Sequence, residues 1–155
     1  MNDSVKQILD CFAAALAPIT AVATIYIAFR QYHLEKLKEK RELYEKRLAI
    51  FKSTTGLLAH ILRHASVDDS TLYKFVGDTN ESDFLLGKDI RDYLWSLYLK
   101  GIELQELREK LYESNLPDGE ERTRVALAKR DLLVWYGNQF DVAREKFAKH
   151  LRLDK

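Results

Sequence analysis

The chain has 155 residues and a formal net charge of +1, from 25 basic and 24 acidic side chains. Hydrophobic residues make up 46% and charged residues 32%, which is typical of one folded domain, or two at most. The balanced charge excludes a generic polycation for nucleic acid. Cys11 is the single cysteine, so an intrachain disulfide and a cysteine-built zinc or iron–sulfur site are excluded. With 6 glycines and 2 prolines the chain has few turn residues, and we expect an all-α fold.

The first predicted element is an N-terminal transmembrane helix within residues 1–30. Residues 11–29 read CFAAALAPITAVATIYIAF and contain no charged side chain. At ~1.5 Å per helical residue they extend about 28 Å, close to the ~30 Å hydrocarbon core of a bilayer. Two alternatives stay open. The segment could be a signal peptide, which its acidic start and Pro18 after an Ala-Leu-Ala triplet disfavour, or a buried core helix.

The charges that flank this segment predict its orientation. Residues 30–52 hold eight basic side chains, whereas the first ten residues hold only Lys6. The positive-inside rule therefore places residues 31–155 in the cytoplasm and the N-terminus outside. We expect a single-pass protein of the bacterial inner membrane, with the lipid membrane as a partner.

Small residues recur along one face of the predicted span. In lipid, helices associate where small side chains let their backbones approach closely. This stripe therefore predicts the interface of a homo-oligomer or a weakly polar pore, and the alternative is a lone alanine-rich anchor. The stripe consists of Ala13, Ala17, Thr20 and Thr24.

A juxtamembrane helix is predicted over residues 31–65, where only Gly56 is a helix breaker. Its apolar residues follow one another in steps of three and four from Leu34 to Leu62, which is the pattern of a coiled-coil seam. From Leu43 onward a second apolar stripe widens this face, so we expect the second half of the helix to lie in a bundle core. Arg41 is a lone charge in the seam, and it could bind an anion at the centre of an oligomer or simply snorkel.

The rest of the chain predicts a cytosolic three-helix antiparallel bundle that includes the juxtamembrane helix. Residues 66–83 are rich in turn and cap residues and predict a connection with at most one short helical turn. A second helix is expected over residues 84–114, with Lys88 as an alternative start, and a third over residues 118–151. Short links between three long amphipathic helices are typical of an up-down-up bundle.

Motifs for catalysis or cofactor binding are missing from the sequence. There is no glycine-rich phosphate loop and no G-x-S-x-G motif. His60 and His64 have the i,i+4 spacing of metalloprotease helices, but no general base lies between them, and only Asp68 or Asp69 could add a further ligand. We expect two partly exposed histidines at a helix end, no metal site, no cofactor, no catalytic residue and no enzymatic activity.

Four basic residues cluster at the start of the third predicted helix, near Trp135 and Tyr136. Basic side chains beside stacking aromatics could hold an anionic ligand such as a nucleotide. The alternative is that these side chains pair with the acidic second helix while Trp135 fills the core. The four residues are Arg122, Arg124, Lys129 and Arg130.

Three short stretches carry a resemblance to known proteins. They are LYEKRLAIF at 43–51, DFLLG at 83–87 and the Trp-Tyr pair at 135–136. Together they resemble a group of small bacterial membrane proteins with an N-terminal span, a basic juxtamembrane stretch and a cytosolic helical tail. The resemblance implies this layout and no catalytic residues. The layout is also similar to that of membrane effectors in bacterial antiviral defence, including the cyclic-oligoadenylate-gated effector of type III CRISPR systems.

These observations predict a self-associating membrane protein whose cytosolic bundle signals to its membrane helix. The bundle would bind a protein partner or a small anionic ligand, for example a nucleotide second messenger. Two alternatives stay open. One is a ligand-gated effector of antiviral defence that perturbs the membrane, and the other is a passive anchor or scaffold for a cytosolic partner.

Overall fold

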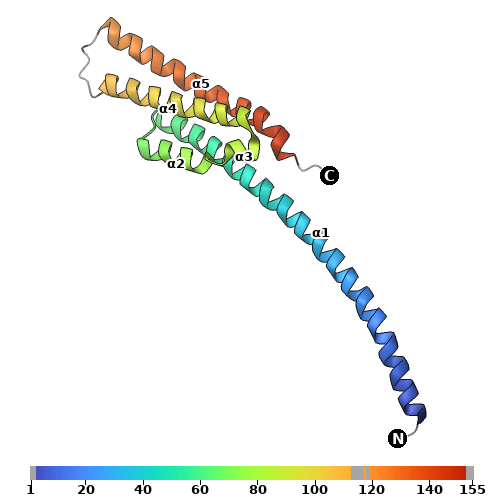
Figure 1. The fold of residues 1–155 in the computed structure, drawn as a ribbon. Coiled ribbons are helices and arrows are strands. Elements are labelled where there is room, and N and C mark those ends of the chain that lie inside the picture. The colour runs from blue at the N-terminus through green and yellow to red at the C-terminus, as the bar shows by residue number, and fades with distance from the viewer. Residues whose placement is uncertain (1–2, 113–116, 118, 153–155) are drawn as a thin grey trace. The chain divides into compact units, whose positions relative to one another are not determined.

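A computed structural model describes the backbone of residues 3–112, 117 and 119–152, and the side chains of these from residue 20 onward. It contains five helices: α1 (Asp3–His64), α2 (Asp69–Thr79), α3 (Ser82–Leu86), α4 (Lys88–Tyr112) and α5 (Glu120–Leu151) (Figure 1). No strand occurs among these described residues. The prediction of an all-α fold is therefore confirmed.

The chain divides into two compact units, Met1–Glu42 and Leu43–Lys155. In the first unit, all side chains from residue 20 to residue 42 are exposed. No helix within the part of the chain that the structure describes is both long and apolar enough to cross a membrane. The backbone of residues 11–19 of the predicted span belongs to α1, and their side chains lie outside the described part.

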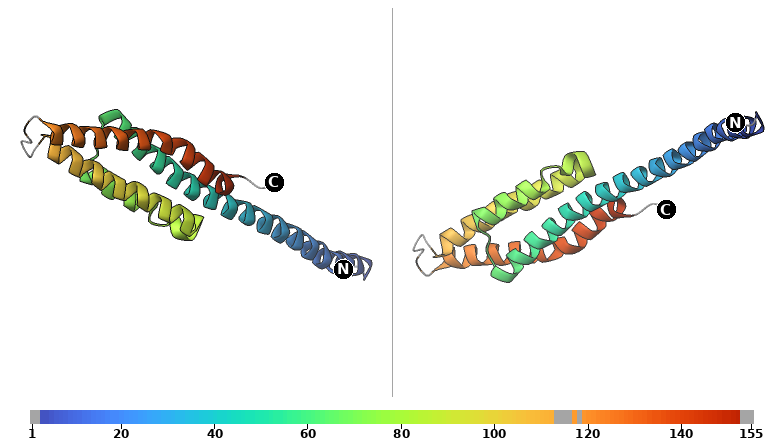
Figure 2. Two further views of the ribbon diagram at one scale, coloured as in Figure 1. Left: turned by 90° about the horizontal axis from the view of Figure 1, so that it is seen from above. Right: turned by 90° about the horizontal axis from the view of Figure 1, so that it is seen from below.

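The second unit is a helical bundle around one hydrophobic core. Figure 2 shows α4 and α5 side by side over part of their lengths, and the C-terminal part of α1 lies beside α5. As expected from the wide apolar face, the second half of the juxtamembrane segment is buried in this core. The fully buried side chains come from all three long helices: Leu58, Ile61, Ile90, Leu97, Leu104, Tyr136, Ala143 and Phe147.

The prediction of a connection over residues 66–83 is wrong, because most of this segment is helical. Asp68 has extended backbone angles (φ −102°, ψ 161°) and accepts a hydrogen bond from the Thr71 N–H at 3.3 Å, so it caps the N-terminus of α2. Leu72, Phe75 and Thr79 then lie on the buried face of α2. The sequence does not reveal this helix clearly, because Gly77 and Asp78, which are typical of turns, lie on the exposed face of its last turn.

The second predicted helix starts at Lys88, the later of the two expected positions. Gly87 separates α3 from α4 because its φ of 88° lies in the left-handed region, which favours glycine. Its N–H donates to the carbonyl oxygens of Ser82 and Asp83, both at 3.2 Å. The residues from 84 to 86 therefore belong to a separate short helix.

Candidate functional site

The predicted anion-binding cluster lies on the first turns of α5. Arg130 pairs with its neighbour Asp131 (Nη2 to Oδ1 3.2 Å), and the Lys129 Nζ lies 5.1 Å from the centroid of the Tyr112 ring. Arg122 also has an interaction within the chain. Arg124 is exposed. None of these four residues lines the grooves described below.

The aromatic pair that was expected beside this cluster is used in packing. Tyr136 is completely buried, and its hydroxyl donates to the Leu97 carbonyl oxygen at 2.8 Å. Trp135 packs against the hydrophobic core, with its ring centroid 5.1 Å from that of Tyr136. Neither ring therefore forms an open platform on which a nucleobase could stack.

The other predicted site residues lie in the first unit. Arg41 is exposed and interacts within the chain. The Thr24 hydroxyl donates to the Thr20 carbonyl oxygen at 2.7 Å, so it is satisfied by its own helix. The side chains of Ala13 and Ala17 lie outside the described residues.

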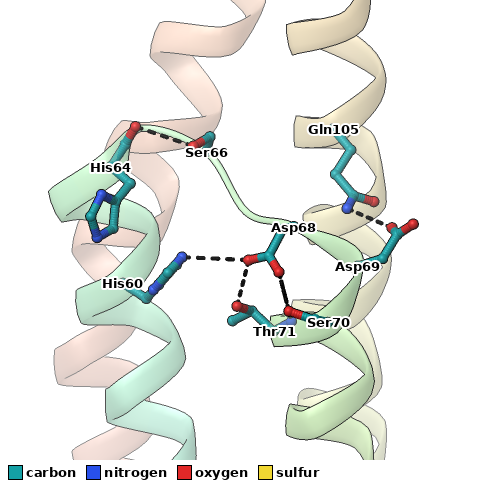
Figure 3. Close-up of polar contacts among 8 residues, drawn as sticks. All are labelled: His60, His64, Ser66, Asp68, Asp69, Ser70, Thr71 and Gln105. Carbon is teal, nitrogen blue, oxygen red and sulfur yellow. Dashed lines mark hydrogen bonds and ion pairs between the residues drawn. The ribbon is translucent and has the colours of Figure 1, made fainter.

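The two histidines stack on one face of α1, with ring centroids 4.6 Å apart (Figure 3). The His60 Nε2 lies 3.8 Å from Asp68 Oδ1. Asp68 also accepts hydrogen bonds from the hydroxyls of Ser70 and Thr71, the latter at 2.6 Å, and these bonds hold its pKa well below the usual range. Among the described residues, no group of three potential metal ligands is assembled. Asp68 thus functions as a helix cap.

A first open groove lies between α1 and α2 and has a volume of about 570 Å³. Lys52 and His60 contribute to it from α1, and Lys74 and Asp78 from α2. The Ser53 hydroxyl donates to Asp78 Oδ2 across the groove at 3.1 Å. Because its lining includes these charged side chains, this groove is the strongest candidate for binding a small charged molecule.

A second groove, of about 410 Å³, lies on the other side of α2, against α4. Its wall includes Trp95 and Tyr98, whose ring centroids are 5.0 Å apart. Arg91 also lines it, but this guanidinium is held by Asp92 at 2.8 Å and by Asp83 at 3.4 Å. This groove is more apolar, and its single cation is already neutralised.

A partly buried joint connects α1 to the ends of α3 and α5 in the second unit. Arg47 donates to the Leu85 carbonyl oxygen at 3.0 Å and to the His150 carbonyl oxygen at 3.4 Å, so it ties α1 to α3 and α5. The His150 Nε2 is buried and has no hydrogen-bond partner among the described residues. Burial, with smaller contributions from Lys149 and Arg47, lowers the pKa of His150. The joint is a structural feature of the bundle.

Both grooves depend on α2, and the sequence interpretation missed them because it placed a connection there. The available signal was the Asp68-x-x-Thr71 cap followed by Leu72, Phe75 and Thr79 at helical spacing. Lys52 and Lys74 carry no signal of their own in the sequence. Only the packing of α2 against α1 brings them to one groove.

Comparison with protein-family models, with curated proteins and with solved structures finds no match to this chain. The function is therefore argued from the geometry alone.

Proposed function

We propose that this chain is a membrane-anchored, self-associating protein whose helical bundle binds a ligand or partner and communicates with the membrane helix. The observation that carries the proposal is the exposed apolar surface of α1 in the first unit. Ile25, Ile27 and Phe29 are 69%, 54% and 62% exposed. At about 100° per residue, Ile25 and Phe29 lie on one face of the helix and Ile27 lies on the opposite face, so apolar side chains are exposed on both sides of α1.

An isolated helix that is apolar on all sides requires an apolar environment. Residues 20–29 continue the uncharged sequence that starts at Cys11, and a strongly basic segment follows at Arg30. A lipid bilayer suits this order of residues, with the basic segment among the headgroups on the cytoplasmic side. The second unit would then lie in the cytoplasm.

The same helix supports the proposed communication. α1 is continuous from Asp3 to His64, and its last part supplies Ile50, Leu57, Leu58 and Ile61 to the bundle core. A ligand that changes how this part packs therefore acts on the helix that enters the membrane. Self-association is supported by Leu34 and Leu37, which are 55% and 63% exposed at seam positions.

The anchor is tested by placing charges in the middle of the proposed span. In the variant Ile19→Lys with Val22→Lys, each lysine costs about 2.5–3.5 kcal/mol of insertion free energy, so the protein should leave carbonate-washed membranes. The matched control, Ile19→Leu with Val22→Leu, should stay in the membrane fraction. A wild-type protein that carbonate extracts completely would contradict the proposal.

A fluorescent protein at the C-terminus tests the orientation, because this reporter folds in the cytoplasm and stays dark after export through the general secretion pathway. Fluorescence in intact cells is the expected result. A dark but membrane-bound fusion would reverse the proposed topology.

A further inference from the structure

The groove between α1 and α2 carries two lysines from opposite walls. Lys52 lies on α1 and Lys74 on α2, and the cavity of about 570 Å³ lies within the size range of small-molecule sites, roughly 300–1,000 Å³. The Ser53 hydroxyl and the Asp78 carboxylate line the same cavity. The groove therefore combines cationic donors with groups that can accept hydrogen bonds.

The two lysines differ from most other lysines of the bundle. Lys46, Lys100 and Lys146 each pair with a carboxylate, at 3.9, 2.7 and 3.2 Å. Within the described part of the chain, neither the Lys52 nor the Lys74 ammonium group makes an ion pair or a hydrogen bond.

Asp78 is the obvious partner for Lys74, one helical turn away, but it accepts a hydrogen bond from Ser53 instead. Two ammonium groups thus line one cavity together with a single carboxylate, that of Asp78. The lining therefore carries an excess of positive charge, which a bound anion would offset.

Gly56 keeps the α1 wall of the groove open. It lies in the interior of a long helix, where glycine is less favourable than alanine. No heavy atom lies within 4 Å of the position that a Cβ would occupy, so close packing does not require glycine here. The missing side chain instead leaves space beside Lys52 and Ser53.

We propose that this groove binds a phosphorylated sugar, with its phosphate between Lys52 and Lys74 and its hydroxyl groups at Asp78 and Ser53. A lysine ammonium is a good phosphate donor, and a carboxylate accepts hydrogen bonds from sugar hydroxyls. A ligand that carries both groups satisfies both kinds of lining residue, whereas a bare anion would face Asp78 as well. This inference rests on the proposed function, for which it names the ligand class.

The test is calorimetric titration of the full-length protein in detergent with ribose 5-phosphate as the probe. We expect binding in the range of about 0.1–1 mM, with Lys52→Gln and Lys74→Gln each weakening it roughly tenfold, as for a lost charge-assisted hydrogen bond. Lys88→Gln removes the same charge from an exposed position on α4 and should change Kd less than twofold. No binding at 10 mM, or equal weakening by all three variants, would overturn the site.

Two further variants separate the parts of the proposal. Gly56→Leu fills the cavity without removing charge, so it should abolish binding while the circular dichroism of the protein stays unchanged. Asp78→Asn should weaken the binding of ribose 5-phosphate relative to that of inorganic phosphate, because it removes an acceptor for the sugar hydroxyls and a charge that repels the bare anion. If Asp78→Asn changes neither affinity and both probes bind equally well, the assignment to a sugar is wrong.

The same chemistry occurs in the headgroup of phosphatidylglycerol, which carries a phosphate and hydroxyl groups. Repeating the titration in nanodiscs with and without this lipid distinguishes the sources: competition assigns the headgroup, and an unchanged Kd assigns a free sugar phosphate. Binding in detergent does not depend on membrane insertion. Failure of the ligand site and failure of the anchor are therefore measured separately.

Discussion

The same substitution, glycine to alanine, should have opposite effects at two helical positions of the bundle. Gly56 in α1 has open space where a Cβ would lie. Gly101 in α4 is buried, and a Cβ there would lie 2.6 Å from Leu72 Cδ2 and 3.3 Å from Leu72 Cδ1. Leu72 is itself only 2% exposed, so it has little room to move. At Gly101 the Leu72 side chain of α2 thus packs directly against the backbone of α4.

The magnitudes follow from these contacts. Alanine in place of glycine in a helix gains about 0.5–1 kcal/mol, and Gly56→Ala should gain this in full. Gly101→Ala gains the same amount but overpacks the core at Leu72, which costs about 1–3 kcal/mol. The net effect should be a loss of up to about 2.5 kcal/mol. For a unit of this size, a change of 1 kcal/mol shifts Tm by about 4 °C.

Tryptophan fluorescence is the suitable assay, because both tryptophans of the chain, Trp95 and Trp135, lie in the bundle. Thermal unfolding of the full chain in detergent should give a higher Tm for Gly56→Ala and a lower Tm for Gly101→Ala. A double variant provides the control: Leu72→Ala should cost less in the Gly101→Ala background than in the wild type, by about 0.5–3 kcal/mol. Two single variants that shift Tm in the same direction would refute the reasoning.

Three further predictions concern the core, the helix ends and the membrane segment. Tyr136→Phe removes a buried hydrogen bond to a backbone carbonyl of α4 and should cost about 1 kcal/mol of unfolding free energy, measured by the same fluorescence assay; an unchanged Tm would contradict this. Burial and Lys149 lower the pKa of His150 in the folded protein, so the unfolded chain binds this proton first as the pH falls. The free energy of unfolding should therefore be constant above the ordinary pKa of 6.5 and decrease below it, before the carboxylates titrate. His150→Gln should flatten that part of the pH profile. Ala17→Leu with Thr20→Leu should convert a homo-oligomer to monomers in native mass spectrometry, and an oligomer that survives would remove these residues from the interface.

The three long helices could be predicted because their signals are local and repeated. Leu58, Ile61, Leu97, Leu104 and Phe147 recur at helical spacing, and all are fully buried. A periodic apolar face must be covered wherever the helix lies, so periodicity alone identifies both the helix and its inner side. The second half of α1 was expected in the core for this reason.

The short elements and the grooves could not be predicted in the same way. α3 has five residues, and its separation from α4 depends on the positive φ of Gly87. The predicted ligand site on α5 combined four basic residues with Trp135 and Tyr136, and the sequence left open whether these rings are accessible. Packing decided that point, because Tyr136 is completely buried and donates a hydrogen bond to the Leu97 carbonyl oxygen.

The sequence by itself determined that the chain is helical, where its three long helices lie, and which faces are apolar, because these properties depend on residues within a few turns of one another. It also determined the uncharged segment at 11–29 and the basic residues after it. The tertiary structure alone decided that α2 packs between α1 and α4, and thus that Lys52 and Lys74 share a groove. These two residues are far apart in the chain, and only the burial of Leu72 and Phe75 against the other helices brings their side chains to one cavity.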